Sequence, residues 1–457
     1  MADDRPNLLL VFADQLRADA VGCYGNEVVR TPTIDALARQ GVRAQHCFAN
    51  YPCCGPMRAS MLTAVDASRH GVIANDLAIR TDLPTLGTTL RDAGYRTGYV
   101  GKWHLDGVPR SKYTPPGPRR LGFDDYWAVC NCAHDYFRPY YYRDTPQRID
   151  AEGYEPIVQT ELAIEFLQSH REMNQPFGLV VSWGPPHDPY PQVPEQYRDL
   201  YDPARLPLRP NVQPATENAL ANGLECRRTI ADYYAATTAL DEQLDRLLST
   251  LNQLGMAENT LVVFTSDHGD MLWSHGWMKK QSPYAESVHV PLVLRGPSLP
   301  AGETCDALVG LMDLTPTLLG LLGVEPPDAM HWRDRSDVLR DERHADEVDA
   351  VLLANPFATD EARDQQMPEW RGLRTHTHTY VETEPGKAWL LFSDIEDPYQ
   401  MRNLVGDPTV RDLQRRLSLR LAALLQQADD PFLPGEQWLD RLGLTAAWQD
   451  REARVWQ

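Results

Sequence analysis

Two pairs of polar residues each follow an apolar segment of the chain. Asp14-Gln15 comes after the run 7–13, and Asp267-His268 comes after the run 260–266. Carboxylate and amide oxygens together with an imidazole nitrogen are donors that a divalent cation accepts. A single aspartate after a strand is more often a helix cap or a solvated turn. Two such pairs in one chain favour a metal site, although spacing alone leaves both interpretations open.

A third candidate for chemistry is the segment Cys54-Gly55-Pro56-Met57-Arg58. Proline is favoured in the first turn of a helix, so Pro56 places Cys54 at the positive N-terminal end of a helix. Arg58 comes four residues after the cysteine, and both side chains can therefore face the same site. Such a helix end is suited to an anionic substrate. The alternative is a buried structural cysteine with a solvated arginine, and the pattern alone favours that alternative.

The elements that must position these residues alternate between strands and helices. Continuous apolar runs predict buried strands, and apolar residues at helical spacing, bounded by proline or glycine, predict helices. We expect strands at 7–15, 95–101, 177–183 and 260–269, and helices at 31–41, 85–94, 156–170, 228–256 and 313–323. This order predicts an α/β fold with a large, mainly parallel sheet sandwiched by helices. In such a fold, functional groups gather beyond the carboxyl ends of the strands.

The pattern of elements changes after about residue 345. Short strands are expected at 350–354, 370–375, 378–383 and 388–393, followed by a helix at 408–428. We therefore predict a catalytic α/β domain over residues 1–345 and a smaller C-terminal domain, an antiparallel sheet plus a helix, over residues 346–457. The region 107–155 has little periodicity and many Pro, Tyr, Arg and Asp residues. It is expected to be a long surface loop that shapes a substrate pocket.

The composition excludes several classes of function. The 457 residues carry a formal net charge of −20, which argues against nucleic acid as a partner. The apolar runs are too short to span a membrane. The first residues, MADDRPN, are acidic where a signal peptide is positive, so we expect a cytoplasmic protein, or a periplasmic or secreted one if a leader was removed. Eight cysteines are too few for a disulfide scaffold in a chain of this length.

Several longer motifs resemble the formylglycine-dependent (type I) sulfatases of the alkaline phosphatase superfamily. CGPMRASMLTA at 54–64 matches the C-x-P-x-R signature, in which an activating enzyme oxidises the cysteine to formylglycine. Further similar segments occur in the order typical of the family. They are NLLLVFADQLRADAVGCYGN from 7, GYRTGYVGKWH from 94, PPHDPY from 185, TLVVFTSDHGD from 260 and HGWMKKQSPYAESVHVPL from 275. The resemblance covers residues 6–300, with weaker matches to about residue 405.

The resemblance implies a role for each matching residue. The implied metal ligands are Asp14, Gln15, Asp267, His268 and the modified Cys54. The implied catalytic residues are Cys54, Arg58, Lys102, His104, His187 and Lys280. In the family, the hydrated aldehyde attacks the sulfur of a sulfate ester while cationic side chains hold the sulfate oxygens.

The implied oxygen-rich metal site favours Ca²⁺, and the nitrogen donor of His268 makes Mn²⁺ the alternative. Lys102 and His104 are two apart in an expected extended stretch, so we expect both side chains to point to one face. Lys279 neighbours Lys280, and register with the family favours Lys280.

The resemblance implies a carbohydrate or aryl sulfate as the substrate and a formylglycine-generating enzyme as the maturation partner. The net charge of −20 favours a small substrate or a chain end over an extended sulfated polymer. The oligomeric state is not predicted. The main alternative is a phosphonate monoester hydrolase or phosphodiesterase of the same superfamily, because Gln15 and His268 resemble the residues of that branch. Lys102-Trp103-His104 argues against this alternative. A catalytically inactive binding protein on the same scaffold is a further alternative, and the filled catalytic positions argue against it.

Overall fold

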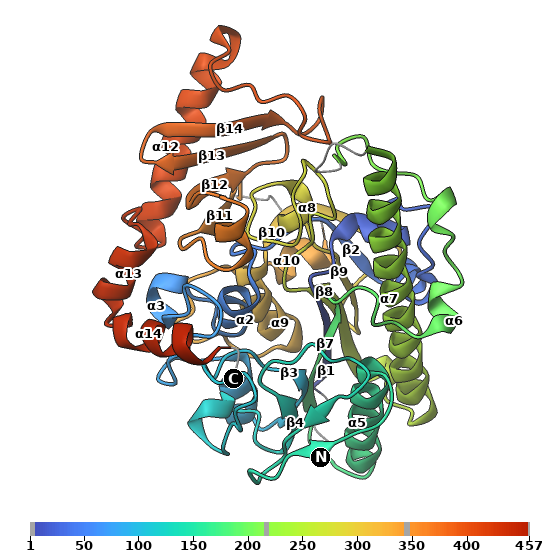
Figure 1. Cartoon of the computed structure of the whole chain (residues 1–457). Coiled ribbons are helices and arrows are strands. Elements are labelled where there is room, and N and C mark those ends of the chain that lie inside the picture. The colour runs from blue at the N-terminus through green and yellow to red at the C-terminus, as the bar shows by residue number, and fades with distance from the viewer. Residues whose placement is uncertain (1–4, 214–218, 342–347, 456–457) are drawn as a thin grey trace.

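The computed structural model describes residues 5–213, 219–341 and 348–455, and its centre is an eight-stranded sheet (Figure 1). The strand order is β10-β2-β9-β8-β1-β7-β3-β4. Every neighbouring pair is parallel except those of β9, which is antiparallel to β2 and β8. The bounds are β1 Asn7–Asp14, β2 Val42–Phe48, β3 Arg96–Lys102, β4 Tyr126–Cys130, β7 Phe177–Pro186, β8 Thr260–Ser266, β9 Leu292–Arg295 and β10 Glu303–Gly310.

Hydrophobic cores cover both faces of this sheet. The central strand β1 contributes side chains to both cores, which explains its continuous apolar sequence. Leu8, Leu10 and Phe12 belong to one hydrophobic core, whereas Leu9 and Val11 belong to the other. Successive side chains of a strand point to opposite faces, so a strand between two helical layers needs apolar residues at every position. The expected fold class is confirmed.

The helices divide between the two faces of the sheet. One core includes residues of α2 Cys54–Thr63, α4 Leu86–Asp92 and α9 Leu314–Leu322. The other includes residues of α1 Pro32–Gln40, α5 Glu155–His170 and α7 Ala219–Gln253. The remaining short helices of this part are α3 Ala67–His70, α6 Glu195–Arg198, α8 Ala285–Val288 and α10 Ser336–Arg340.

A four-stranded antiparallel sheet forms the C-terminal part (Figure 1). Its order is β11-β12-β13-β14, and residues of α12 pack in the core on one of its faces. On the other face, residues of the small sheet share a core with Phe48, Val288 and Leu308 of the large part. The bounds are β11 Val351–Asn355, α11 Glu361–Asp364, β12 Trp370–Arg374, β13 His378–Glu384, β14 Lys387–Ser393, α12 Arg411–Gln427, α13 Gly435–Leu442 and α14 Thr445–Arg454.

The boundary predicted at residues 345 and 346 lies outside the described residues, and the two-domain division stays a prediction. Among the residues that the structure describes, no helix combines the length and apolar character needed to cross a membrane.

The expectation of a long surface loop at 107–155 is wrong in part. Residues Tyr126–Cys130 form β4, a fully buried edge strand parallel to β3. Tyr140–Tyr141 and Ile149–Asp150 form the short hairpin of β5 and β6. The strand YWAVC is five residues long and is flanked by polar residues, so it gives little periodic signal of its own. The rest of the region has no long helix or strand, and part of it reaches the candidate site.

Candidate active site and metal centre

The two predicted metal-binding pairs meet because their strands are parallel neighbours. Asp14 is the last residue of β1 and Asp267 directly follows β8, with Ala13 in register with Ser266. Carboxyl ends of adjacent parallel strands lie at the same edge of a sheet. The backbone amide of Gln15 donates to Oδ1 of Asp267 across 3.0 Å. The site therefore forms where the fold class predicts it.

Four fully buried side chains could hold a metal ion. One ligand atom from each of Asp14, Cys54, Asp267 and His268 lies within 4.8 Å of the others. His268 Nε2 is 3.6 Å from Asp14 Oδ1 and 3.7 Å from Asp267 Oδ1. His268 Nδ1 lies 2.9 Å from the carbonyl of Gly269, an arrangement that places the proton on Nδ1 and leaves the Nε2 lone pair for a ligand. Two carboxylates and an imidazole nitrogen fit a divalent cation.

Gln15 is held by hydrogen bonds that orient its amide group. Its Nε2 donates to Oδ2 of Asp270 across 2.6 Å, and its Oε1 accepts from Lys280 Nζ across 3.0 Å. Tyr190 donates to the same Asp270 oxygen across 2.8 Å. The amide oxygen of Gln15 therefore points toward the candidate site. Sequence analysis did not identify Asp270, although its place three residues after Asp267 is a usable signal.

Cys54 begins α2, as the sequence predicts, and its sulfur lies among the candidate ligands. Sγ is 3.5 Å from Asp14 Oδ1 and 3.2 Å from His268 Nε2. Burial and the charge of Asp14 raise the pKa of the Cys54 thiol, but neighbouring cations outweigh both effects and lower it to about 5. The largest of these cationic contributions come from Lys102 and Lys280.

Arg58 extends the same cluster by one turn of α2. Its Nε donates to Asp267 Oδ2 across 2.8 Å, and its Nη2 donates to Asp14 Oδ2 across 3.0 Å. Its Nη1 donates to Ser182 Oγ across 2.7 Å. The side chain is fully buried, so the alternative of a solvated arginine is wrong. The guanidinium balances two carboxylates and leaves their Oδ1 atoms facing His268.

Two lysines approach the sulfur of Cys54. Lys102 Nζ donates to Asp14 Oδ2 across 2.6 Å and lies 3.9 Å from Cys54 Sγ. Lys280 Nζ lies 3.2 Å from the same sulfur and 2.6 Å from His187 Nε2. Burial and the charge of Lys280 lower the pKa of His187. Two ammonium groups therefore approach the position at which an anionic substrate would meet Cys54.

His104 is placed differently from the expectation of an extended stretch. Strand β3 ends at Lys102, and His104 has a φ of 60°, so the alternation of side chains does not continue to this residue. His104 Nε2 lies 3.0 Å from Asp76 Oδ1. Burial lowers the pKa of His104, but the charge of Cys132 and the hydrogen bond to Asp76 outweigh it and raise the pKa to about 10. The charge of Lys102 acts in the opposite direction.

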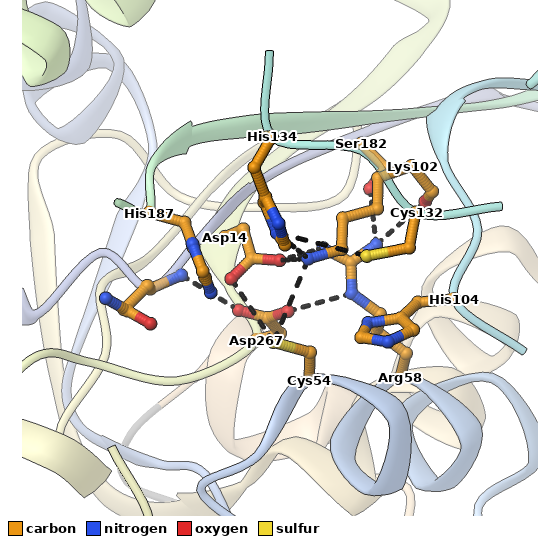
Figure 2. A network of polar contacts seen from close by, with 12 residues as sticks. Asp14, Cys54, Arg58, Lys102, His104, Cys132, His134, Ser182, His187 and Asp267 are labelled. Atoms are coloured by element: carbon orange, nitrogen blue, oxygen red, sulfur yellow. Dashed lines mark hydrogen bonds and ion pairs between the residues drawn. The ribbon is translucent and has the colours of Figure 1, made fainter. Parts of the chain in front are cut away.

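The region 107–155 contributes two residues that sequence analysis missed. The ring of His134 stacks on His187 at a centroid distance of 4.4 Å and an interplanar angle of 6°. Its Nε2 is 3.4 Å from Lys102 Nζ and 3.9 Å from Cys132 Sγ (Figure 2). His134 is partly exposed, whereas Lys102 and His187 are buried. The segment around His134 and Cys132 has no periodic pattern, so the sequence does not indicate that these two residues reach the site.

Comparisons with known proteins agree with this geometry. A family model described as "Sulfatase" matches residues 6–324, and one described as "N-sulphoglucosamine sulphohydrolase, C-terminal" matches residues 273–427. The chain is 36% identical to an ulvan-active sulfatase of Formosa agariphila over 443 residues, 96% of this chain and 84% of that protein. It is 26% identical to an N-acetylglucosamine-6-O-sulfatase of Bacteroides thetaiotaomicron over 506 residues, 93% of this chain and 87% of that protein.

Solved structures share the whole fold. A candidate sulfatase, yidJ, from Bacteroides fragilis superposes with a TM-score of 0.85 and 30% identity, covering 94% of this chain and 98% of that chain. The phosphonate monoester hydrolase of Agrobacterium radiobacter has a TM-score of 0.76 at 24% identity, covering 93% of this chain and 96% of that one. At that identity the second likeness concerns the fold alone.

Proposed function

Because the chain belongs to the sulfatase family of the alkaline phosphatase superfamily and is a sulfuric ester hydrolase, we propose that it cleaves a sulfate monoester of a carbohydrate through a formylglycine made from Cys54. One observation carries the proposal: the sulfur of Cys54 lies within 4 Å of two candidate metal ligands, Asp14 and His268, and within 4 Å of the ammonium groups of two lysines, Lys102 and Lys280. A nucleophile between a cation site and an anion clamp suits attack on an anionic ester.

The residues present fit a divalent cation, and Asp14, Gln15, Asp267 and His268 would hold it. A bound cation supplies Lewis-acid chemistry and lowers the pKa of a neighbouring hydroxyl. Formylglycine supplies, as its hydrate, the hydroxyl that attacks sulfur. We propose Ca²⁺, with Mn²⁺ as the alternative, because oxygen donors outnumber the single nitrogen donor of the set. Elemental analysis of the active protein tests the choice.

The roles of the remaining site residues follow from charge and position. Lys102 and Lys280 would each donate to sulfate oxygens, since both ammonium groups lie within 4 Å of the position of the nucleophile. Their charges are worth most here because the site is buried and its effective dielectric constant is low. His187 contacts Lys280 and would hold that ammonium in place. Arg58 would orient the hydrate through its fixed pairs with Asp14 and Asp267.

A carbohydrate sulfate is favoured by the names of the relatives. Two relatives, which align over 96% and 93% of this chain, are named for activity on ulvan and on N-acetylglucosamine-6-O-sulfate. We propose a small substrate or a chain end, because the net charge of −20 opposes the approach of a long sulfated polymer. An aryl sulfate would meet the same clamp and serves as the test compound.

The runner-up function is phosphonate monoester hydrolysis. Gln15 and His268 in the metal set favour it, and a phosphonate monoester hydrolase shares the fold. Lys102 beside the nucleophile favours the sulfatase. The deciding experiment compares kcat/KM for matched aryl sulfate, phosphate and phosphonate esters, followed by sulfated oligosaccharides of increasing length. A higher kcat/KM for the phosphonate ester would show that the protein is a phosphonate monoester hydrolase. A kcat/KM that increases with oligosaccharide length would refute only the preference for small substrates.

A further inference from the structure

Asp76 is a buried carboxylate at which several charged groups meet beside the site. It is 2% exposed and has a φ of 67°, a backbone conformation that is uncommon for a residue other than glycine. One of its oxygens is 3.0 Å from His104 Nε2. Arg110 donates to both oxygens, across 2.9 Å from Nε and 2.8 Å from Nη2. A strained residue that is held by several partners is a candidate for a functional role.

The C-terminal helix supplies the third partner of Asp76. Arg451 lies on α14, is 2% exposed, and places Nη2 3.5 Å from Asp76 Oδ2. The same Nη2 atom is 2.5 Å from both carboxylate oxygens of Asp360. A buried guanidinium next to two carboxylates is costly to remove, because its partners would remain charged and unpaired. Helix α14 lies beyond residue 427, where the second of the two matching family models ends.

We infer that Asp76 and Arg451 are positioning residues for His104, so that the C-terminal helix takes part in setting the catalytic geometry. The inference rests on the proposed function and on the role that the family resemblance implies for His104, which is to support the formylglycine hydrate. It adds two residues that neither the sequence motifs nor the family resemblance assign. Asp76 accepts the Nε2–H of His104 and so fixes the ring, while Arg451 fixes Asp76 from the other side.

The hydrogen-bond pattern determines which atom of His104 is left for the reacting group. Nε2 is engaged by Asp76, Cys132 forms a side-chain hydrogen bond with the ring, and Nδ1 is buried without an oxygen or nitrogen partner among the residues that the structure describes. Sulfur is a weak acceptor, so an imidazole N–H beside it can still donate to a stronger anionic group. With Nε2–H held by a carboxylate, a charged His104 presents Nδ1–H as a donor to an anionic group. This arrangement is the same orienting logic by which a carboxylate fixes a catalytic histidine in hydrolases.

The charges around His104 determine the expected pH dependence. Cys132, Lys102 and Asp76 face the imidazole, and Arg110 and Arg451 face Asp76. The pKa of His104 is raised, so its charged form is present at neutral pH and is lost as the pH rises through that pKa. Removing the charge of Asp76 must lower the pKa of His104. The alkaline limb of the pH–rate profile would then move to lower pH.

The test uses the full-length converted enzyme and p-nitrophenyl sulfate. Asp76→Asn keeps an oxygen that accepts the Nε2–H of His104 and removes only the charge. Arg451→Gln removes the contact from the C-terminal helix. Arg454→Gln is the matched control, because Arg454 lies on the same helix, is partly exposed, and pairs with Asp450 and not with Asp76. For each variant, kcat and KM are measured against pH, and the melting temperature is recorded.

We expect Asp76→Asn to lower kcat about 10- to 100-fold with KM little changed, and to shift the alkaline limb to lower pH. Arg451→Gln should lower kcat about 3- to 30-fold, and Arg454→Gln should match the wild type. The inference is overturned if Asp76→Asn and Arg451→Gln keep the wild-type kcat and pH profile and lose only thermal stability. If Asp76→Asn does not fold, Arg451→Gln against Arg454→Gln decides alone. Sulfate release by the wild type and by the Arg454→Gln control tests the proposed function separately.

Discussion

The ammonium of Lys280 lies 3.2 Å from the sulfur of Cys54, although 226 positions separate the two residues in the chain. The neighbouring Lys279 takes a different direction. Its Nζ pairs with Glu361 across 3.2 Å and with Asp188 across 3.4 Å. The side-chain directions therefore distinguish Lys280 from Lys279, whereas the sequence motif distinguishes them only by their position in the alignment with the family.

This difference predicts unequal effects of two alanine substitutions. Lys280→Ala should lower kcat/KM on an aryl sulfate by about 100-fold or more, because it removes a buried cation beside the nucleophile. Lys279→Ala should lower it by less than about fivefold, because its ammonium pairs with Glu361 and Asp188 in two partly exposed ion pairs and not with the nucleophile. Steady-state kinetics on the converted enzyme measures both. Equal losses in the two variants would contradict the assignment.

The site of formylglycine formation is the next prediction. Cys54 should carry the aldehyde, because only its sulfur lies at the metal-ligand cluster, whereas Cys53 precedes α2 as its N-cap. Peptide mass spectrometry of protein made with the activating enzyme should show the loss of the thiol at Cys54 alone. Cys53→Ala should keep most of the activity, and Cys54→Ala should abolish it. An unmodified Cys54 thiol in fully active enzyme would refute the prediction.

The sequence predicted the central elements well, because a strand covered on both faces leaves a continuous apolar run, as in β1. Sequence analysis did not identify β2 and β9, and each omission has a physical reason. Strand β2 contains the partly exposed residues Arg43 and Gln45, which interrupt its apolar pattern. Strand β9 spans only four residues, too few for a periodic signal. Pairing with distant neighbours, not local pattern, makes both of them strands.

Some residues of the candidate site could likewise be predicted from the sequence, and others could not. The relation of Cys54 to Arg58 follows from helix geometry, and the meeting of Asp14 with Asp267 follows from the sheet, so both could be predicted. His134, Asp76 and Asp270 reach the site through tertiary contacts between segments far apart in the chain. Their positions depend on how loops pack, and neither periodicity nor spacing encodes that packing.

If His268 is a metal ligand, its replacement should shift the relative affinities of the site for Mn²⁺ and Ca²⁺. Chelation should abolish activity, and Ca²⁺ should restore it better than Mn²⁺. His268→Asn replaces nitrogen by oxygen, so the affinity for Mn²⁺ should fall about 10- to 100-fold while the affinity for Ca²⁺ changes less. Isothermal titration calorimetry on metal-free protein measures both affinities independently of activity. Full activity of the metal-free enzyme would exclude either metal, and an unchanged ratio of affinities would exclude His268 as a ligand.

The last prediction concerns stability and rests on Glu155 at the start of α5. The residue is 3% exposed, and its Oε2 has no hydrogen-bond partner within the described part of the chain. Burial raises the pKa of Glu155 to about 8, despite the opposing charge of Lys102. Between the unfolded pKa of about 4.3 and this value, the folded protein binds the proton more tightly than the unfolded chain does. The free energy of unfolding must therefore fall as the pH rises through this window.

Glu155→Gln removes the ionisable group and keeps the shape of the side chain, so the variant should gain stability over the wild type as the pH rises from 5 to 8, by up to about 4 kcal/mol. Urea unfolding at both pH values measures the difference. Glu165→Gln is the control, because Glu165 lies on the same helix and its side chain is 56% exposed, so the pH dependence of that variant should match the wild type. Equal pH dependence of the wild type and Glu155→Gln would show that Glu155 is ionised at neutral pH in the folded protein, and that its burial is offset by Lys102 more fully than the geometry indicates.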